Sequence, residues 1–168
     1  IRIGRIKKST VKLLEERKIP YEKTSDIVPT ILLPSRISVE DINTVEHNKL
    51  SHEGSKVFSM EIVMPTFYSE NTTQQNVFTE IETFKKSNIY SESLEIRIGD
   101  QVICNRNISD TIVNGSRGIV TEINEYPVVE FMNGIKQEIK PFDIPHETIK
   151  GLIFRQIPLN YAWALTIH

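Results

Sequence analysis

The pattern of apolar and polar positions changes character along the chain. In residues 1–52 it predicts a helix, a strand and a second helix. Ser9 or Thr10 can cap the first helix, which continues through 11–18 and ends before a proline. Residues 30–33 then form a continuous apolar run between two prolines. Such a run is typical of a strand buried on both faces, as in the parallel sheet of an α/β domain.

The second helix is predicted to begin at Ser38. The Ser38 hydroxyl can accept a hydrogen bond from the amide of Asp41, and the Asp41 carboxylate can reach back, as in a short capping box. Val39, Ile42 and Val45 place an apolar stripe on one face of this helix. Helix, buried strand and helix in succession indicate an α/β core.

The pattern becomes less regular after residue 52. Residues 56–64 are predicted to form a strand that ends before a proline. The stretch 66–93 is polar and rich in Ser, Thr, Asn and Glu. Within it, Phe78, Ile81 and Phe84 recur at a spacing of three, which suggests one or two helical turns.

From residue 94 onward the pattern is that of β-structure. Leu94–Ile98 alternates strictly, as a half-buried strand does, and Gly99-Asp100 turns the chain into the next strand. We expect a two-residue hairpin turn at Asn133-Gly134, because Asn-Gly tolerates the positive φ of a type I′ turn. Short strands at this density fit a small antiparallel barrel. The further strands are predicted at 101–104, 117–123, 128–131 and 135–139.

Composition excludes several classes of protein but does not identify the function of this one. Hydrophobic residues at 39% and charged residues at 25% are ordinary for a globular chain, and no apolar run reaches the length of a membrane span. The single cysteine, Cys104, excludes an internal disulfide and a cysteine zinc site, so an intracellular setting is expected. The net charge of −2 argues against a free-standing nucleic-acid binder, although a motor domain can hold a local basic groove.

Four stretches carry motifs that composition does not explain. Ile1–Gly4 precedes a helix that ends in Leu13-Leu14, and Ile31–Arg36 is followed by Val39, Ile42 and Asn43. The other two are Leu94–Ile103 with Asn107 and Ile112–Val120, and Gln156–Leu159 with Ala162–His168.

In order and spacing, these stretches resemble the Pif-type DNA helicases of superfamily 1B. They are similar to the family's segments I-R-x-G, L-x-P-[ST]-R, L-x-L-x-x-G-x-x-V…N…V-N-G-[AS]-x-G-x-V and Q-x-P-L…A-[WY]-A-x-T-x-H. The resemblance covers most of the chain, residues 66–93 excepted. In the family the last segment continues into K-[SA]-Q-G, so we expect the chain to be a piece of a larger motor.

The resemblance implies an α/β RecA-like partial domain, of the P-loop NTPase type, that carries an all-β SH3-like barrel. Residues 1–52 and 155–168 would belong to the second RecA-like domain, and residues 53–154 would form the inserted barrel domain. Family members couple ATP hydrolysis to 5′-to-3′ travel along single-stranded DNA. The expected partners are therefore single-stranded DNA and the flanking motor domain, with no membrane.

ATP and Mg²⁺ would be cofactors of the parent protein. No Gly in this chain is followed by Lys, and no Asp-Glu pair is present, so the chain carries neither a phosphate loop nor that magnesium site. We therefore expect the fragment by itself to bind no cofactor and to be inactive.

The resemblance also indicates DNA-binding residues. Thr166 and His168 would face the DNA, where a hydroxyl and an imidazole can donate to phosphate oxygens. Arg36 follows the predicted strand where α/β proteins place ligand loops, although it could equally be a solvated arginine at a helix start. Asn114 is first a turn former beside Gly, and Arg117 could reach a phosphate from the barrel.

Other candidates have simpler structural interpretations. Trp163 could stack on a base but sits in an apolar run and is more simply a core residue. His47, His52 and His146 show no metal-ligand spacing and are interpreted as surface residues. Cys104 lies in a predicted strand and is interpreted as a small buried hydrophobe.

Two alternatives to the helicase hypothesis remain open at this point. One is a stand-alone barrel that binds nucleic acid, and the other is a barrel that binds peptides in an aromatic-lined groove. The predicted barrel carries few aromatics, namely Tyr126, Phe131 and Phe142, which disfavours the peptide-binding alternative. The sequence does not give the oligomeric state, the preferred DNA structure or the partner proteins.

Overall fold

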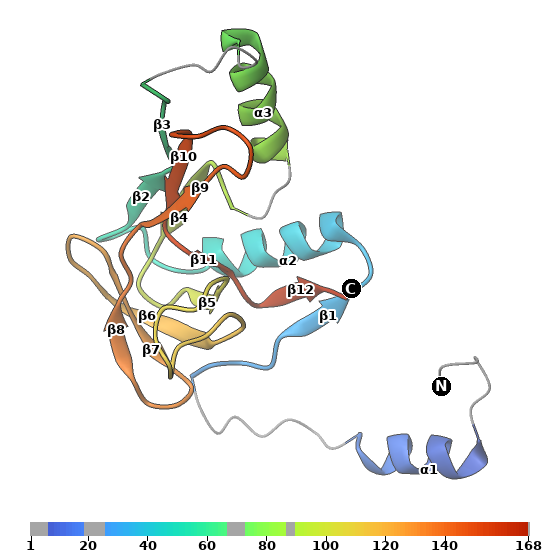
Figure 1. Cartoon of the computed structure of the whole chain (residues 1–168). Coiled ribbons are helices and arrows are strands. Elements are labelled where there is room, and N and C mark those ends of the chain that lie inside the picture. The colour runs from blue at the N-terminus through green and yellow to red at the C-terminus, as the bar shows by residue number, and fades with distance from the viewer. Residues whose placement is uncertain (1–6, 19–25, 67–72, 87–89, 168) are drawn as a thin grey trace.

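The computed structural model describes residues 7–18, 26–66, 73–86 and 90–167 (Figure 1). These residues form three helices and twelve strands. The helices are α1 (Lys8–Glu16), α2 (Arg36–Asn48) and α3 (Gln74–Lys86). No helix within this part of the chain has the length and apolar character needed to cross a membrane.

Two strands from opposite ends of the chain pair with each other. β1 (Ile31–Leu33) lies parallel to β12 (Ala164–Thr166), with Ile31 opposite Ala164 and Leu33 opposite Thr166. Figure 1 shows this pair beside α2, blue against red, near the C-terminus. The sequence predicts that 30–33 packs against the terminal segment 156–168, because each is too apolar and too short to stand alone, and the parallel pair confirms this.

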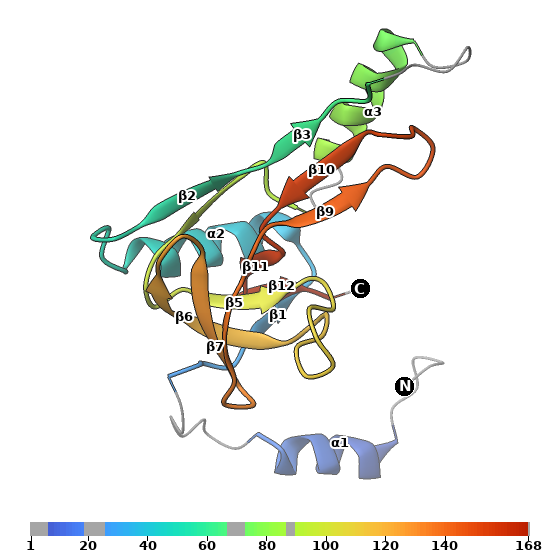
Figure 2. The ribbon, with the colours of Figure 1, turned by 60° about the vertical axis from the view of Figure 1, so that its left-hand side comes forward.

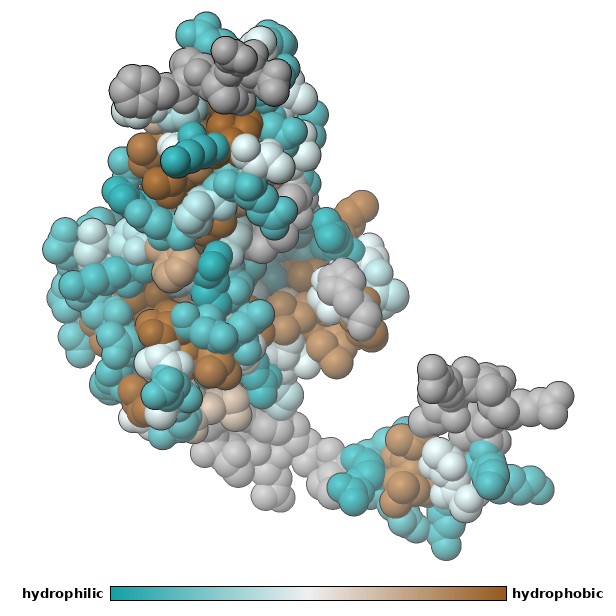
Figure 3. Space-filling model, viewed as in Figure 1, coloured by the Kyte–Doolittle hydropathy of each residue, from teal (hydrophilic) through white to brown (hydrophobic). Residues whose placement is uncertain are grey.

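The burial of β1 differs from the expectation. Leu32 is 61% exposed and Ile31 49%, so the strand is not buried on both faces. The reason is that the β1–β12 sheet has only two strands among the described residues. Figure 3 shows apolar surface near the end of the chain where β1 and β12 lie. Val28, Ile31, Leu32 and Ile167 are all exposed.

Helix boundaries also differ from the sequence expectation. The N-cap of α2 is Ser35 rather than Ser38, and that of α1 is Lys7, and neither makes a side-chain capping bond. On α2 the buried residues are Asn43 and His47, whereas Val45 of the predicted apolar stripe is exposed. This helix thus packs with a polar face, because its neighbours offer backbone and charged groups rather than an apolar layer.

The β-rich region contains a five-stranded antiparallel sheet in the order β11-β5-β6-β7-β8. A separate two-stranded sheet joins β2 to β4. Both sheets share one apolar core, which includes Phe58, Leu94, Val102, Val120 and Ile157. The strands are β2 (Lys56–Ser59), β4 (Ser93–Ile96), β5 (Gln101–Cys104), β6 (Arg117–Ile123), β7 (Pro127–Phe131), β8 (Lys136–Glu138) and β11 (Leu159–Tyr161).

The predicted strands are present, but no closed barrel forms among the described residues. Leu94–Ile103 supplies two strands as expected, yet β4 pairs with β2 whereas β5 pairs with β6 and β11. The turn at Ile98-Gly99 sends the two strands into different sheets. The prediction that this region is built of antiparallel strands is confirmed.

The hairpin between β7 and β8 joins the predicted segments, but its register is shifted by one residue from that of a two-residue turn, with Val128 opposite Glu138 and Glu130 opposite Lys136. Its turn is longer than expected. The Phe131 carbonyl accepts a hydrogen bond from Gly134, and the Phe131 amide donates to the Ile135 carbonyl. Three residues therefore form the loop, and Gly134, at φ 80°, occupies the last position, where three-residue hairpins favour glycine.

A second apolar core lies under α3. Val77, Ile81 and Phe84 share one face of the helix and pack on Phe154 and its neighbours. The helical turns suggested by the spacing of three are thus part of a longer helix, although Phe78 is exposed. The sheet beneath consists of β3 (Glu61–Val63), β10 (Ile153–Gln156) and β9 (Phe142–Pro145). Figure 2 shows β2 and β3 end to end, so one extended stretch, predicted as a single strand, passes from one core to the other.

Gly118 offers a test of the close packing between β6 and β7. A Cβ atom at this position would lie 2.5 Å from Val129 Cγ1 and 2.6 Å from the Glu130 carbonyl oxygen. We expect Gly118→Ala to lower the free energy of unfolding by about 1–3 kcal/mol in urea titrations, because backbone atoms cannot yield easily. Glu122→Ala, on an exposed position of the same strand, is the control and should change it by less than about 0.5 kcal/mol. Equal effects of the two changes would contradict this account.

Candidate nucleic-acid interface

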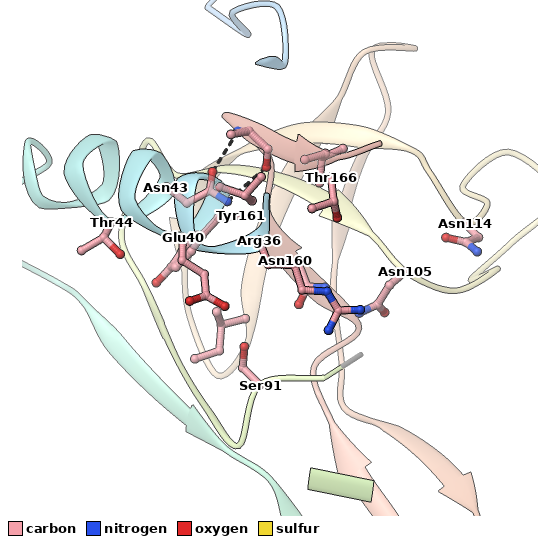
Figure 4. Close-up of a pocket in the computed structure, with 14 residues that line it drawn as sticks. Arg36, Glu40, Asn43, Thr44, Ser91, Asn105, Asn114, Asn160, Tyr161 and Thr166 are labelled. Carbon is pink, nitrogen blue, oxygen red and sulfur yellow. Dashed lines mark hydrogen bonds between the residues drawn. The ribbon is translucent and has the colours of Figure 1, made fainter. Parts of the chain in front are cut away.

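A cleft of about 650 Å³ opens between α2 and the strands β11 and β12. Val39, Leu94 and Leu165 supply its apolar wall. The polar lining is dominated by carboxamides and hydroxyls, with one cation and one anion. These polar residues are Arg36, Glu40, Asn43, Thr44, Ser91, Asn105, Asn114, Asn160, Tyr161 and Thr166 (Figure 4).

Three of the predicted DNA-binding residues meet at this cleft. Arg36, at the start of α2, points toward Asn105 and Asn160 in Figure 4. Thr166 enters from the end of β12, and Asn114 enters from the loop between β5 and β6. Parallel pairing of β1 and β12 explains why Arg36 and Thr166 meet, because the ends of two neighbouring parallel strands lie at the same edge.

Asn114 also acts in the turn that the sequence indicated. Its amide donates to Asn107 Oδ1 at 2.8 Å, and Gly115 follows with φ of 93°. The Ser116 hydroxyl closes the turn by accepting from the Val113 amide at 2.9 Å. The turn therefore fixes the edge of the cleft on which Asn114 lies.

Arg117 and His168 are placed differently. Arg117 does not line the cleft, and its Nη1 donates to Thr30 Oγ1 at 2.9 Å. The Thr30 hydroxyl in turn donates to the Ala162 carbonyl at 2.8 Å, so Arg117 joins β6 to the segment before β1. A DNA contact by Arg117 stays a prediction, and His168 lies outside the described residues.

The interpretation of His47 as a surface residue is wrong. This side chain is buried, and its Nδ1 lies 2.7 Å from Asp100 Oδ1. His146 is also partly buried: its Nδ1 accepts the amide of Ile149, and its Nε2 faces Glu80 at 3.4 Å. Only His52 is largely exposed as expected. Trp163 and Cys104 are buried, which confirms the core interpretation of both.

The alternating pattern of Leu94–Ile98 predicts that the Arg97 side chain is exposed, and this is also wrong. It is 1% exposed, whereas Ile98, expected inside, is half exposed. Arg97 Nη1 donates to the carbonyls of His47 and Leu50 at 3.1 and 3.2 Å, at the end of α2. A cation at a helix C-terminus satisfies carbonyls that have no partner within the helix. The strand β4 ends at Ile96, two residues before the predicted end at Ile98, and Arg97 bonds to the helix end instead of continuing the alternation.

Arg97 belongs to a cluster of polar side chains with His47, Glu95, Asp100 and Tyr161. Three groups of this cluster have shifted pKa values. Hydrogen bonding from Arg97 lowers the pKa of Glu95 to about 2. Burial raises the pKa of Asp100, against the opposing effect of its bond to His47. Burial also raises the pKa of Tyr161, helped by the charges of Asp100 and Glu95. Because Tyr161 lines the cleft and donates to the Glu95 carbonyl, the cluster supports one wall of the cleft.

Comparison with known proteins gives a consistent result. Residues 81–123 match the family described as DNA helicase Pif1, 2B domain. The ATP-dependent DNA helicase Pif1 of Bdellovibrio bacteriovorus is 28% identical over 100% of this chain, and PIF1 of Xenopus laevis is 24% identical over 86%. Over most of its length the chain is similar to these Pif1 helicases. It spans 36% and 25% of the length of these two Pif1 proteins.

The fold agrees with that of a solved Pif1 helicase. The crystal structure of Pif1 from Candida albicans matches 98% of this chain with a TM-score of 0.71 at 24% identity, and the match covers 42% of the Candida chain. The Pif1-like segment at 81–123 includes the end of α3 and the strands β4, β5 and β6. Ser91, Leu94, Asn105 and Asn114 of this segment line the cleft together with residues of α2, β11 and β12. The cleft therefore joins the Pif1 2B-like segment to its flanking elements.

The pH dependence of stability tests the role of Glu95 in the polar cluster that supports Tyr161 at the cleft. The pKa of Glu95, about 2, lies below the ordinary 4.5, so its ionised form stabilises the fold above that ordinary value and the stabilisation is lost as pH falls toward 2. Glu95→Gln should therefore lower the urea midpoint at about pH 7, and the difference from wild type should shrink at about pH 3. Glu53→Gln, at an exposed position, is the control. A difference that stays constant with pH would contradict the assignment.

Proposed function

We propose that this chain is the part of an ATP-dependent 5′-to-3′ DNA helicase that grips single-stranded DNA. The observation that carries the proposal is the convergence of Arg36, Asn114 and Thr166, three residues far apart in the sequence, on one cleft. Its relatives are named ATP-dependent DNA helicases, which supports the motor context.

In this proposal residues 1–52 and 155–168 are parts of the second RecA-like domain. Residues 53–154 are an inserted SH3-like domain, whose strands divide among several sheets rather than close into a barrel among the described residues. The parallel β1–β12 pair supports this division, because the chain leaves a parallel sheet at one strand and returns to it at the other. The exposed apolar surface of β1 then faces the rest of the motor.

The cleft has the chemistry to hold a nucleic-acid backbone. Arg36 offers a fork of N–H donors suited to a phosphate, and the Thr166 hydroxyl and Asn114 carboxamide can donate to neighbouring oxygens. Glu40 in the same lining repels phosphate and limits the affinity. The crystal structure of Bacteroides Pif1 bound to single-stranded DNA aligns over 97% of this chain with a TM-score of 0.57, which supports the choice of partner.

ATP and Mg²⁺ do not fit the residues present in this chain. No glycine is followed by lysine, so there is no backbone cradle with its phosphate-binding lysine. We propose that the flanking motor domain of the parent protein supplies the nucleotide site. The contribution of this chain is to hold the DNA while that site changes shape.

The DNA grip can be tested by fluorescence anisotropy with labelled oligonucleotides. Wild-type chain should bind a dT oligonucleotide and a mixed sequence alike, because backbone contacts carry no sequence information. Arg36→Ala should weaken both about threefold to tenfold and reduce the slope of log affinity against log salt by about 0.7.

Arg17→Ala removes the same charge outside the cleft lining and is the matched control for that experiment. Arg117→Ala measures the remaining predicted arginine separately. Binding that ignores salt, or that strongly prefers one base sequence, would contradict the backbone grip and favour a stand-alone binding module.

The absence of a nucleotide site predicts a second result. A phosphate-release assay with ATP, Mg²⁺ and single-stranded DNA should show no turnover above the buffer rate, because phosphoryl transfer requires a phosphate cradle and a metal site. ATP hydrolysis by the purified wild-type chain that is lost in the Arg36→Ala variant would contradict the proposal.

A further inference from the structure

The backbone of β12 is held on both edges, although β1 is its only partner strand among the described residues. On one edge the Ile31 amide donates to the Trp163 carbonyl at 2.8 Å, and the Ile167 amide donates to the Leu33 carbonyl at 2.9 Å. The amide and carbonyl of Ala164, between these bonds, pair with a side chain from α2. Asn43 Oδ1 accepts from the Ala164 amide at 2.9 Å, and Asn43 Nδ2 donates to the Ala164 carbonyl at 3.1 Å (Figure 4).

The Asn43 carboxamide therefore takes the place of a neighbouring strand. It presents one acceptor and one donor in the arrangement that a peptide group would present to Ala164. Both partners are buried, with Ala164 fully inaccessible, so an unpaired amide and carbonyl there would carry a desolvation penalty. A strand of only three residues has few other bonds to hold it in place.

The position of Thr166 depends on this pairing. The three consecutive residues Ala164, Leu165 and Thr166 of β12 all line the cleft. Side chains two residues apart on a strand lie on the same face, so Ala164 and Thr166 share one face of β12. Asn43 and Thr166 both line the cleft, from the helix and from the strand. A shift of β12 relative to α2 would carry the Thr166 hydroxyl with it.

We infer that Asn43 is a positioning residue for the DNA contact made by Thr166. The inference rests on the proposed function and extends it to a buried helix residue that the DNA-binding candidates did not include. Asp at this position could accept from the Ala164 amide but would set a carboxylate against the Ala164 carbonyl. Ala would leave both backbone groups without their partner.

The test uses the whole 168-residue chain with four variants: Asn43→Ala, Asn43→Asp, Thr166→Ala and the double variant Asn43→Ala/Thr166→Ala. Asn48→Ala is the matched control, since it removes the same carboxamide from an exposed position of the same helix. Each protein is measured by anisotropy with a labelled dT oligonucleotide, by thermal unfolding, and by hydrogen exchange of the Ala164 amide in NMR spectra.

We expect Asn43→Ala and Asn43→Asp to weaken dT binding about fivefold, and Thr166→Ala to weaken it by a similar factor. The double variant should bind as the Thr166→Ala variant does, because a residue that acts through Thr166 has no effect once that hydroxyl is gone. In Asn43→Ala the Ala164 amide should exchange at least about tenfold faster, since its acceptor is lost. Asn48→Ala should match wild type in all three measurements.

Three results with the variants would overturn the inference. A lower unfolding temperature with unchanged affinity of the folded protein would make Asn43 a purely structural residue. Additive losses in the double variant would mean that Asn43 contacts DNA by itself. Unchanged exchange at Ala164 would show that the carboxamide does not hold the strand. A wild-type chain that fails to bind dT would refute the proposed function and the DNA role of Asn43 together, and the exchange measurement would still decide whether Asn43 fixes β12.

Discussion

The parallel pairing of β1 with β12 is the interaction on which the rest of the structure depends. Parallel strands need a crossover connection, and here the connection contains an entire β-rich region with two apolar cores. The pair brings the start of α2 and the end of β12 to one edge. Without it, Arg36 and Thr166 would belong to unrelated parts of the chain, and the cleft would have no second wall.

Strands of three residues cannot hold such a long crossover by themselves, and buried polar side chains supply the additional bonds. Gln101 donates to the carbonyls of Val28 and Ala162, both at 2.9 Å, and accepts from the Val28 amide at 2.8 Å. Asn43 pairs with Ala164 in the same manner. In each case a carboxamide replaces a peptide group, which satisfies backbone atoms that would otherwise be buried without partners.

The joint between α2 and the antiparallel sheets is polar for the same reason. Arg97 and Asp100 from the β4–β5 turn bind the end of α2 through its last carbonyls and through His47. Buried ionic contacts gain little net free energy after desolvation, but they are demanding in geometry. An apolar joint would tolerate sliding, whereas these bonds accept one arrangement of helix and sheet. The wall of the cleft that includes Tyr161 is fixed by this arrangement.

The sequence by itself determined the strands at 101–104, 117–123 and 128–131, the glycine turn at 134, and the order of motifs that resembles the Pif-type helicases. These features depend on alternation, turn chemistry and local residue types, which act over a few neighbouring positions. The pairing of 30–33 with the terminal segment was also predictable, because two short apolar segments each required a partner.

Only the tertiary structure decided which polar residues would be buried. His47, Arg97 and Asn43 follow no pattern that distinguishes them from surface residues, since their partners lie about 50 to 120 positions away. The three-residue hairpin turn and the split of β4 and β5 between two sheets likewise depend on how distant elements pack. Burial of a polar group is favourable only when a specific distant partner is present, and a single sequence contains no local trace of that partner.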